Sequence, residues 1–314
     1  MSSLHPQVAA LIEAARNSNL PPLHSVGAAE ARAIYRQSRR ALQPPAPAVA
    51  ACEDITIPGP AGAIPARYYR PQGHHAEEEV PALVFFHGGG WVVGDLDTHD
   101  VLCRELANGS GCAVFAIDYR MGPEHRFPAA VDDAIAAVGH VARPESGYRI
   151  DRSRIAVGGD SAGGNLAAVV ALAARDAGGP PLAWQLLIYP VTDLHMRHPS
   201  YERNGSGYLL TREQMHYFRD QYLASIDQRD DWRASPLRAA DLTGLPPAFV
   251  LTAGFDPLLD EGQAYADRLA QAGVAVEYRC YEDMVHGFIL MGGVLDTARV
   301  AVADCAARLA QAMR

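Results

Sequence analysis

A serine at position 161 lies in the segment of this sequence that is best suited to nucleophilic chemistry. Residues 159–163 read Gly-Asp-Ser-Ala-Gly, which is a G-x-S-x-G pattern. An apolar run at 155–158 precedes the pattern, and an Ala-rich helical segment at 162–177 follows it. A tight turn from strand to helix strains its central residue and lifts the hydroxyl above the sheet edge, beside a helix N-terminus that favours an oxyanion. The pattern predicts Ser161 as a nucleophile; a glycine-rich turn capped by serine is the alternative interpretation.

An earlier glycine-rich segment offers backbone donors for a negatively charged oxygen. Residues 87–91 read His-Gly-Gly-Gly-Trp, and consecutive glycines leave their N–H groups uncovered. We expect the N–H groups of Gly89 and Gly90, together with that of Ala162, to form an oxyanion hole. No G-K-[ST] and no helix-opening G-x-G-x-x-G accompanies these glycines, which argues against a phosphate site. His87 precedes the serine on a different loop, so we expect it to brace the glycine turn rather than act as the base.

The acid and the base of a catalytic triad are expected after late strands, in the order nucleophile, acid, histidine. Asp256 follows an apolar run and precedes Pro257, which can open a helix. Asp260 is the rival acid, but it lies about one helical turn later, where a surface or helix charge is expected. His286 follows a predicted strand at 275–281. Because a neutral imidazole can take the serine proton and return it to a leaving alcohol, we predict Asp256 and His286 as acid and base.

Short apolar runs alternate with helical segments over most of the chain. Runs without polar alternation suit strands that are buried on both faces, so a central, mostly parallel sheet flanked by helices is predicted. The first two strands, separated by Pro-Gly-Pro, are expected to be antiparallel. Eight strands are predicted, at about 54–58, 63–69, 82–86, 113–117, 155–158, 184–188, 248–252 and 275–281. Helices are predicted between and after them, at about 98–109, 128–142, 162–177, 258–272 and 295–313.

Two segments stand outside this alternation. The first, residues 1–45, is helical in pattern and cannot bury its apolar faces alone, so we predict that it forms an N-terminal cap. The second, at about 195–224, interrupts the order of strands with polar and aromatic residues and is expected to be helical at 211–223. We therefore predict a catalytic domain at 46–314 that carries a further cap insertion.

Composition and charge exclude several classes of protein. Apolar residues make up 49% of the 314 residues, and the formal net charge is −9, which disfavours nucleic acid and anionic membranes as partners. No apolar run reaches the length of about eighteen residues that a membrane span needs, and the first residues do not resemble a signal peptide. Five scattered cysteines without a CxxC pair are expected to be reduced. We expect a cytoplasmic protein, and a metal site at His74 and His75 is not expected.

Taken together, these motifs resemble the hormone-sensitive-lipase-like esterases, a branch of the α/β-hydrolases. A further block at 118–130 looks like the family stretch in which acidic and aromatic residues brace the floor of the active site, so Glu124 and His125 are expected to be structural. Met121 and Gly122 stand where the family usually has Leu-Ala. The motifs that carry the resemblance are residues 87–91, 159–165, 256–258 and 286–288.

The resemblance implies an α/β-hydrolase fold with a helical cap and a carboxylesterase that needs no cofactor and no metal. It further implies short- to medium-chain esters as small-molecule substrates and a homodimer. The expected reaction passes through an acyl-enzyme on the serine. Tyr189, Tyr208, Leu209 and Phe288 are candidates for the acyl pocket, with packing in the core as the alternative for each. A ligand receptor without catalysis, and an amidase, lactonase or lipase with the same triad, remain as alternative functions.

Overall fold

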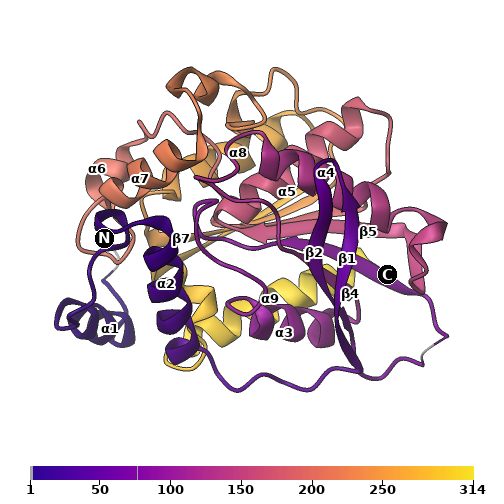
Figure 1. Cartoon of the computed structure of the whole chain (residues 1–314), viewed down its shortest axis with the longest axis horizontal. Coiled ribbons are helices and arrows are strands. Elements are labelled where there is room, and N and C mark those ends of the chain that lie inside the picture. The colour runs from indigo at the N-terminus through magenta and orange to yellow at the C-terminus, as the bar shows by residue number, and fades with distance from the viewer. Residues whose placement is uncertain (1–2, 76) are drawn as a thin grey trace.

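The computed structural model describes residues 3–75 and 77–314, so residues 1 and 2 of the predicted segment 1–45 lie outside the described residues. Within this part of the chain, eight strands form one sheet at the centre of the molecule (Figure 1). The strands are β1 (Ala51–Gly59), β2 (Gly62–Arg70), β3 (Val80–Phe86), β4 (Ala113–Ile117), β5 (Ile150–Asp160), β6 (Trp184–Ile188), β7 (Ala248–Phe255) and β8 (Val276–Val285). Their spatial order is β1-β2-β4-β3-β5-β6-β7-β8.

The sheet is mostly parallel, as predicted. β1 pairs antiparallel with β2, and β2 pairs antiparallel with β4, whereas the remaining neighbours are parallel. The central strands are apolar on both faces because helices cover both sides: every residue of β4 and β6 is buried. β8 lies at the edge and alternates between exposed and partly buried residues over most of its length. The hydrophobic pattern of each strand therefore reports its place in the sheet.

The register aligns the ends of the central strands. Phe86 at the end of β3 pairs with Gly159 of β5, and Asp160 pairs with Ile188 at the end of β6. Ile188 in turn pairs with Leu251 of β7. Since these strands are parallel, the loops that follow them lie along the same edge of the sheet. This edge therefore gathers segments that are far apart in the sequence.

Helices cover the two faces of the sheet and enclose two separate apolar cores. α3 (Asp100–Ser110) and α9 (Asp296–Ala312) pack together on one face, below the sheet in Figure 1. α4 (Ala129–Val141), α5 (Ala162–Asp176) and α8 (Leu259–Gln271) cover the opposite face. Short 3-10 turns occur at Leu23–Ser25, Pro144–Ser146, Ile226–Asp230, Pro236–Arg238 and Phe288–Leu290.

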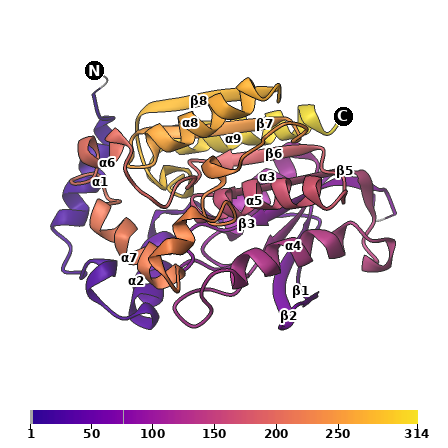
Figure 2. The ribbon, with the colours of Figure 1, turned by 90° about the horizontal axis from the view of Figure 1, so that it is seen from above.

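Four further helices gather at one end of the molecule. α1 (Pro6–Arg16) and α2 (Ala28–Leu42) lie beside α6 (Pro199–Arg203) and α7 (Arg212–Tyr222) in both ribbon views (Figures 1 and 2). The turn at Leu23–Ser25 contacts both α2 and α7, which joins the two groups. The helix expected at 211–223 is thus present as α7. The division of the chain into a cap and a catalytic domain stays a prediction.

Candidate active site

Ser161 occupies the turn between β5 and α5. Its backbone has φ 55° and ψ −116°, a conformation that non-glycine residues rarely adopt and that is found mainly at functional sites. A Cβ on Gly163 would come within 1.8 Å of the carbonyl oxygen of Phe86, so the first turn of α5 presses directly on the end of β3. The strand before Ser161 and the helix after it match the context expected from the sequence.

Two hydrogen bonds connect Ser161 to a histidine and an aspartate. Nε2 of His286 lies 3.0 Å from Oγ of Ser161, and Nδ1 of His286 lies 2.7 Å from Oδ2 of Asp256. The tautomer that satisfies both contacts carries its proton on Nδ1, so Nε2 is free to accept the serine proton. Asp256 is fully buried, and its other oxygen accepts the N–H of Leu258 at 2.8 Å. The three side chains named from the sequence therefore meet at the same edge of the sheet.

The rival candidates have other contacts. Asp260 accepts hydrogen bonds from the N–H of Ser200 and the guanidinium of Arg203, both at 2.8 Å. His87 stacks on Tyr119 with 4.4 Å between ring centroids, and its Nδ1 lies 2.8 Å from the carbonyl of Gly88. His87 therefore supports the glycine loop, and Asp260 attaches α6 to α8.

The glycine loop after β3 lies against the turn that carries Ser161. Gly89 and Gly90 both line the cavity that contains Ser161 and His286, and no described residue accepts a hydrogen bond from either N–H group. Gly90 has φ +61°, and a Cβ there would come within 2.2 Å of the Phe218 ring. The N–H of Ala162 opens α5, where a helix has no internal partner for its donors. Three donors are thus available beside the serine hydroxyl.

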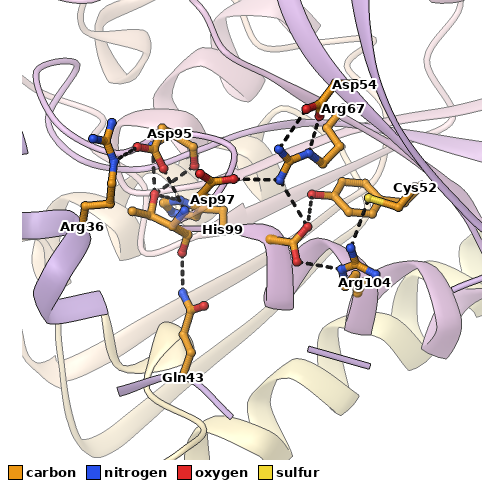
Figure 3. Close-up of polar contacts among 12 residues, drawn as sticks. Arg36, Gln43, Cys52, Asp54, Arg67, Asp95, Asp97, His99 and Arg104 are labelled. Carbon is orange, nitrogen blue, oxygen red and sulfur yellow. Dashed lines mark hydrogen bonds and ion pairs between the residues drawn. The ribbon is translucent and has the colours of Figure 1, made fainter. Parts of the chain in front are cut away.

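A buried carboxylate joins these two loops. Oδ1 of Asp160 accepts the N–H of Gly88 at 2.8 Å and lies 3.1 Å from Nε2 of His99. Burial alone would raise the pKa of Asp160, but the charge of His99 and the two hydrogen bonds outweigh burial and hold that pKa below its ordinary value. An ionised Asp160 therefore fixes the position of the glycine loop. His99 (Figure 3) was not identified from the sequence, since nothing local to it signals this contact.

A cavity of about 250 Å³ opens in front of the serine. It is lined by residues from both helical groups as well as from the sheet edge, so its shape depends on α2 and α7. Tyr189 and Tyr208 do not line it. Most of the wall is apolar and includes Leu20, Leu23, Ile34, Val93, Leu210 and Phe218.

The predicted acyl-pocket residues differ in where they lie. Leu209 lines the cavity, but Tyr189, Tyr208 and Phe288 do not. Tyr189 and Phe288 are fully buried, and the Tyr189 ring lies 4.5 Å from the His286 ring and 6.3 Å from the Phe288 ring. Tyr208 packs on Phe255 instead. Packing in the core, which was the alternative interpretation for each residue, describes where Tyr189 and Phe288 lie.

The described residues contain no group of three or more His, Cys, Asp or Glu side chains that could hold a metal ion. His74 contacts Glu78, with 2.8 Å between Nδ1 and Oε1. In the same part of the chain, no helix combines the length and the apolar character needed to cross a bilayer. All five cysteines are free.

Comparisons with known proteins agree with this geometry. The family described as the alpha/beta hydrolase fold matches residues 83–290. The chain is 50% identical over 242 residues to the carboxylic ester hydrolase LipN of Mycobacterium tuberculosis, which covers 75% of this chain and 64% of LipN. It is 40% identical over 304 residues to an ethyl acetate hydrolase of Pseudomonas putida, covering 94% of this chain and 95% of that protein.

A solved structure extends the similarity to nearly the whole chain. It is that of a mutant of LAE6, an α/β-hydrolase enzyme from the metagenome of Lake Arreo, Spain, which superposes with a TM-score of 0.95 at 42% identity over 99% of both chains. The resemblance seen in the sequence motifs is thereby confirmed. The chain belongs to the hormone-sensitive-lipase-like carboxylesterase family of the α/β-hydrolase fold.

Proposed function

We propose that this carboxylic ester hydrolase acts on small esters through an acyl-enzyme intermediate on Ser161. The observation that carries the proposal is the continuous hydrogen-bonded path from Ser161 through His286 to Asp256 at the wall of one cavity. A serine hydroxyl is a weak nucleophile without an adjacent base, and the base needs an oriented partner. Both requirements are met by side chains that leave the ends of different strands.

In the first step, Oγ of Ser161 attacks the ester carbonyl carbon while Nε2 of His286 takes the hydroxyl proton. The buried Asp256 carboxylate holds the tautomer and stabilises the imidazolium that forms. The carbonyl oxygen becomes negatively charged and is bound by the N–H groups of Gly89, Gly90 and Ala162. Each such donor typically contributes about 2.7–4 kcal/mol to the transition state.

The tetrahedral intermediate then collapses. His286 gives its proton to the alcohol oxygen, the bond between that oxygen and the acyl carbon breaks, and the alcohol leaves. A water molecule attacks the acyl-enzyme while His286 accepts its proton, and the same proton returns to Oγ of Ser161 as the carboxylic acid departs. The enzyme is regenerated and no cofactor takes part in this cycle.

The size and lining of the cavity support short- to medium-chain acyl groups. A volume of about 250 Å³ with a mostly apolar wall suits an alkyl chain of limited length. Rates on nitrophenyl esters of increasing chain length, from acetate to dodecanoate, test this preference. A maximum at the long end, on emulsified substrate, would replace esterase with lipase.

The decisive experiment is labelling with a fluorophosphonate probe, which reacts with activated serine hydroxyls. We expect the purified protein to be labelled at Ser161 and Ser161→Ala to be unlabelled, with kcat on nitrophenyl acetate lower by on the order of 10⁶. Turnover near that of the wild type in Ser161→Ala would exclude this residue as the nucleophile. A wild-type protein that takes no label would favour a non-catalytic receptor.

The proposal also covers the helical cap, the oligomeric state and the location of the protein. Residues 1–45 and 195–224 together would act as a cap, which is supported by Leu20, Ile34 and Leu209 in the cavity wall. A homodimer is supported by β8, whose outer edge has no partner among the described strands, and light scattering tests it. A cytoplasmic location is supported by five free cysteines, of which Cys52 is exposed.

A further inference from the structure

Among the described residues of the active-site cavity wall, one charged side chain has no ion-pair partner. Among the described residues that line the cavity, Asp160 is bonded to His99 and Gly88, and His286 is bonded to Asp256. Arg39 also lines the cavity, and none of the ion pairs between described residues includes it. The cavity therefore presents a guanidinium on an otherwise mostly apolar wall.

Arg39 has donors without acceptors. Its Nε and Nη1 are buried and have no hydrogen-bond partner among the residues that the structure describes. Its guanidinium carbon lies 4.8 Å from the centroid of the Tyr35 ring, a cation–π contact that balances part of the charge but leaves Nε and Nη1 without an acceptor among the described residues. Buried charged donors without acceptors are costly. An acceptor supplied by a bound substrate would remove that cost.

The helix that carries Arg39 is fixed in place by two other arginines. Arg32 of α2 donates to the carbonyls of Val92 and Gly122 and pairs with Glu124 at 2.6 Å. Further along, Arg36 pairs with Asp95 at 2.6 Å (Figure 3). These contacts recur every four residues, so one face of α2 is bound to the loops that follow β3 and β4.

The end of α2 is fixed as well. The side chain of Gln43 donates to the carbonyl of Thr98 at 2.5 Å, as Figure 3 shows for the labelled Gln43. Nη1 of Arg39 lies 3.6 Å from the position that a Cβ on Gly287 would occupy. The guanidinium therefore lies beside the loop that carries His286.

We propose that Arg39 binds a carboxylate carried by the ester substrate, so that the enzyme favours esters whose acyl or alcohol part ends in a negatively charged group. This inference rests on the proposed function, since the carboxylate must be held while Ser161 reacts with the ester bond. A guanidinium binds a carboxylate through two parallel hydrogen bonds, which gives orientation as well as affinity. The carboxylate would give Arg39 both a counter-charge and the acceptors that its donors lack.

Two pairs of esters test the proposal, each pairing a carboxylate with an isopropyl group of similar shape. Monomethyl glutarate and methyl 5-methylhexanoate carry the group on the acyl side. The 4-acetoxybutanoate ion and 4-methylpentyl acetate carry it on the alcohol side. The measured quantity is the ratio of kcat/KM for the charged ester to kcat/KM for its neutral partner, because this ratio does not depend on the fraction of protein that is correctly folded.

We expect Arg39→Met to lower this ratio by about 10-fold to 100-fold for one of the two pairs, as loss of a charge-assisted hydrogen bond implies. The affected pair shows whether Arg39 faces the acyl or the alcohol part. Arg39→Lys should retain part of the ratio. Arg40→Met is the matched control, since it removes the same charge from the same turn of α2 at an exposed residue outside the cavity, and it should leave the ratio unchanged.

An unchanged ratio in Arg39→Met for both pairs would overturn the proposal, and so would an equal fall in Arg40→Met. Failure of the proposed function would look different. In that case the wild-type protein would hydrolyse neither neutral ester and would take no fluorophosphonate label, whereas failure of this inference leaves both reactions intact.

Discussion

The N–H of Gly88 donates to the carboxylate of Asp160 over 2.8 Å, which ties the glycine loop to the residue that precedes Ser161. Gly88 also leaves no room for a side chain, because a Cβ there would come within 2.3 Å of the other carboxylate oxygen of Asp160. His99 lies 3.1 Å from the oxygen that Gly88 contacts. The two loops that the proposed mechanism uses for the nucleophile and the oxyanion are therefore spaced by one buried anion.

Replacing this anion should impair the rate more than substrate binding. Asp160→Asn keeps the shape of the side chain but removes the charge that His99 and Gly88 stabilise. We expect kcat to fall by about 10-fold to 100-fold, because small displacements of donors from a developing oxyanion are costly, while KM changes little. Steady-state kinetics on nitrophenyl acetate measure both constants.

The control for Asp160→Asn is Asp176→Asn at the other end of α5, where Asp176 forms an exposed pair with Arg175. This variant should match the wild type. A normal kcat in Asp160→Asn, with the loops still in place by crystallography, would show that the anion does not set their spacing.

The assignment of the acid is tested by a pair of matched substitutions. Asp256→Asn retains the size of the side chain but favours the wrong tautomer of His286, so kcat should fall by on the order of 10⁴. Asp260→Asn alters the rival acid, whose contacts are with Ser200 and Arg203, and should leave kcat nearly unchanged. Comparable falls in kcat in the two variants would contradict the assignment of Asp256, and not Asp260, as the acid of the triad.

Much of the fold and the three triad positions could be predicted from the sequence because each rests on a local pattern. The apolar run before Ser161 and the helix after it are both short-range signals, and they define a strand-to-helix turn. Asp256 and His286 follow strands of a parallel sheet, whose carboxyl ends share one edge. Topology then brings the three residues together without any knowledge of side-chain packing.

The remainder of the site depends on packing between distant elements, which a single sequence does not encode locally. His99 contacts Asp160 across 61 positions of chain only because β3 and β5 are adjacent. Arg39 reaches the cavity because other arginines fix α2 against the loops after β3 and β4. Tyr189 and Phe288 are aromatic residues of the kind that can line a binding pocket, but they are buried in the core and do not line the cavity.

The glycine loop has little room for side chains, which leads to a prediction about Gly90. Its φ of +61° is strained for alanine, and the added methyl group would meet the Phe218 ring at 2.2 Å. We expect Gly90→Ala to lower kcat/KM by at least about 10²-fold, since the donor at position 90 would be displaced. The double variant with Phe218→Ala should recover part of this loss by removing the clash. If kcat/KM does not recover in the double variant, the whole loss is due to backbone strain at position 90.

Glu261 leads to a prediction about stability. This glutamate of α8 is fully buried, and its Oε1 accepts the N–H groups of Thr192 at 2.7 Å and Asp193 at 3.2 Å. Burial raises its pKa from 4.5 to about 8. The folded protein thus keeps the proton over a range in which the unfolded chain has lost it. This contribution to stability is complete below pH 4.5, is lost as pH rises toward 8, and is constant above that.

Glu261→Gln reproduces the shape of the neutral acid and cannot ionise. The free energy of unfolding of the wild type should fall relative to that of the variant by up to about 1.4 kcal/mol per pH unit between the two pKa values. Urea unfolding of both proteins at intervals from pH 5 to 8 measures this difference, which includes the effect that the Glu261 charge has on the pKa of the neighbouring His198. A difference that stays constant across the range would mean that Glu261 is already ionised in the folded protein at pH 5, its carboxylate stabilised by the two N–H donors in spite of its burial.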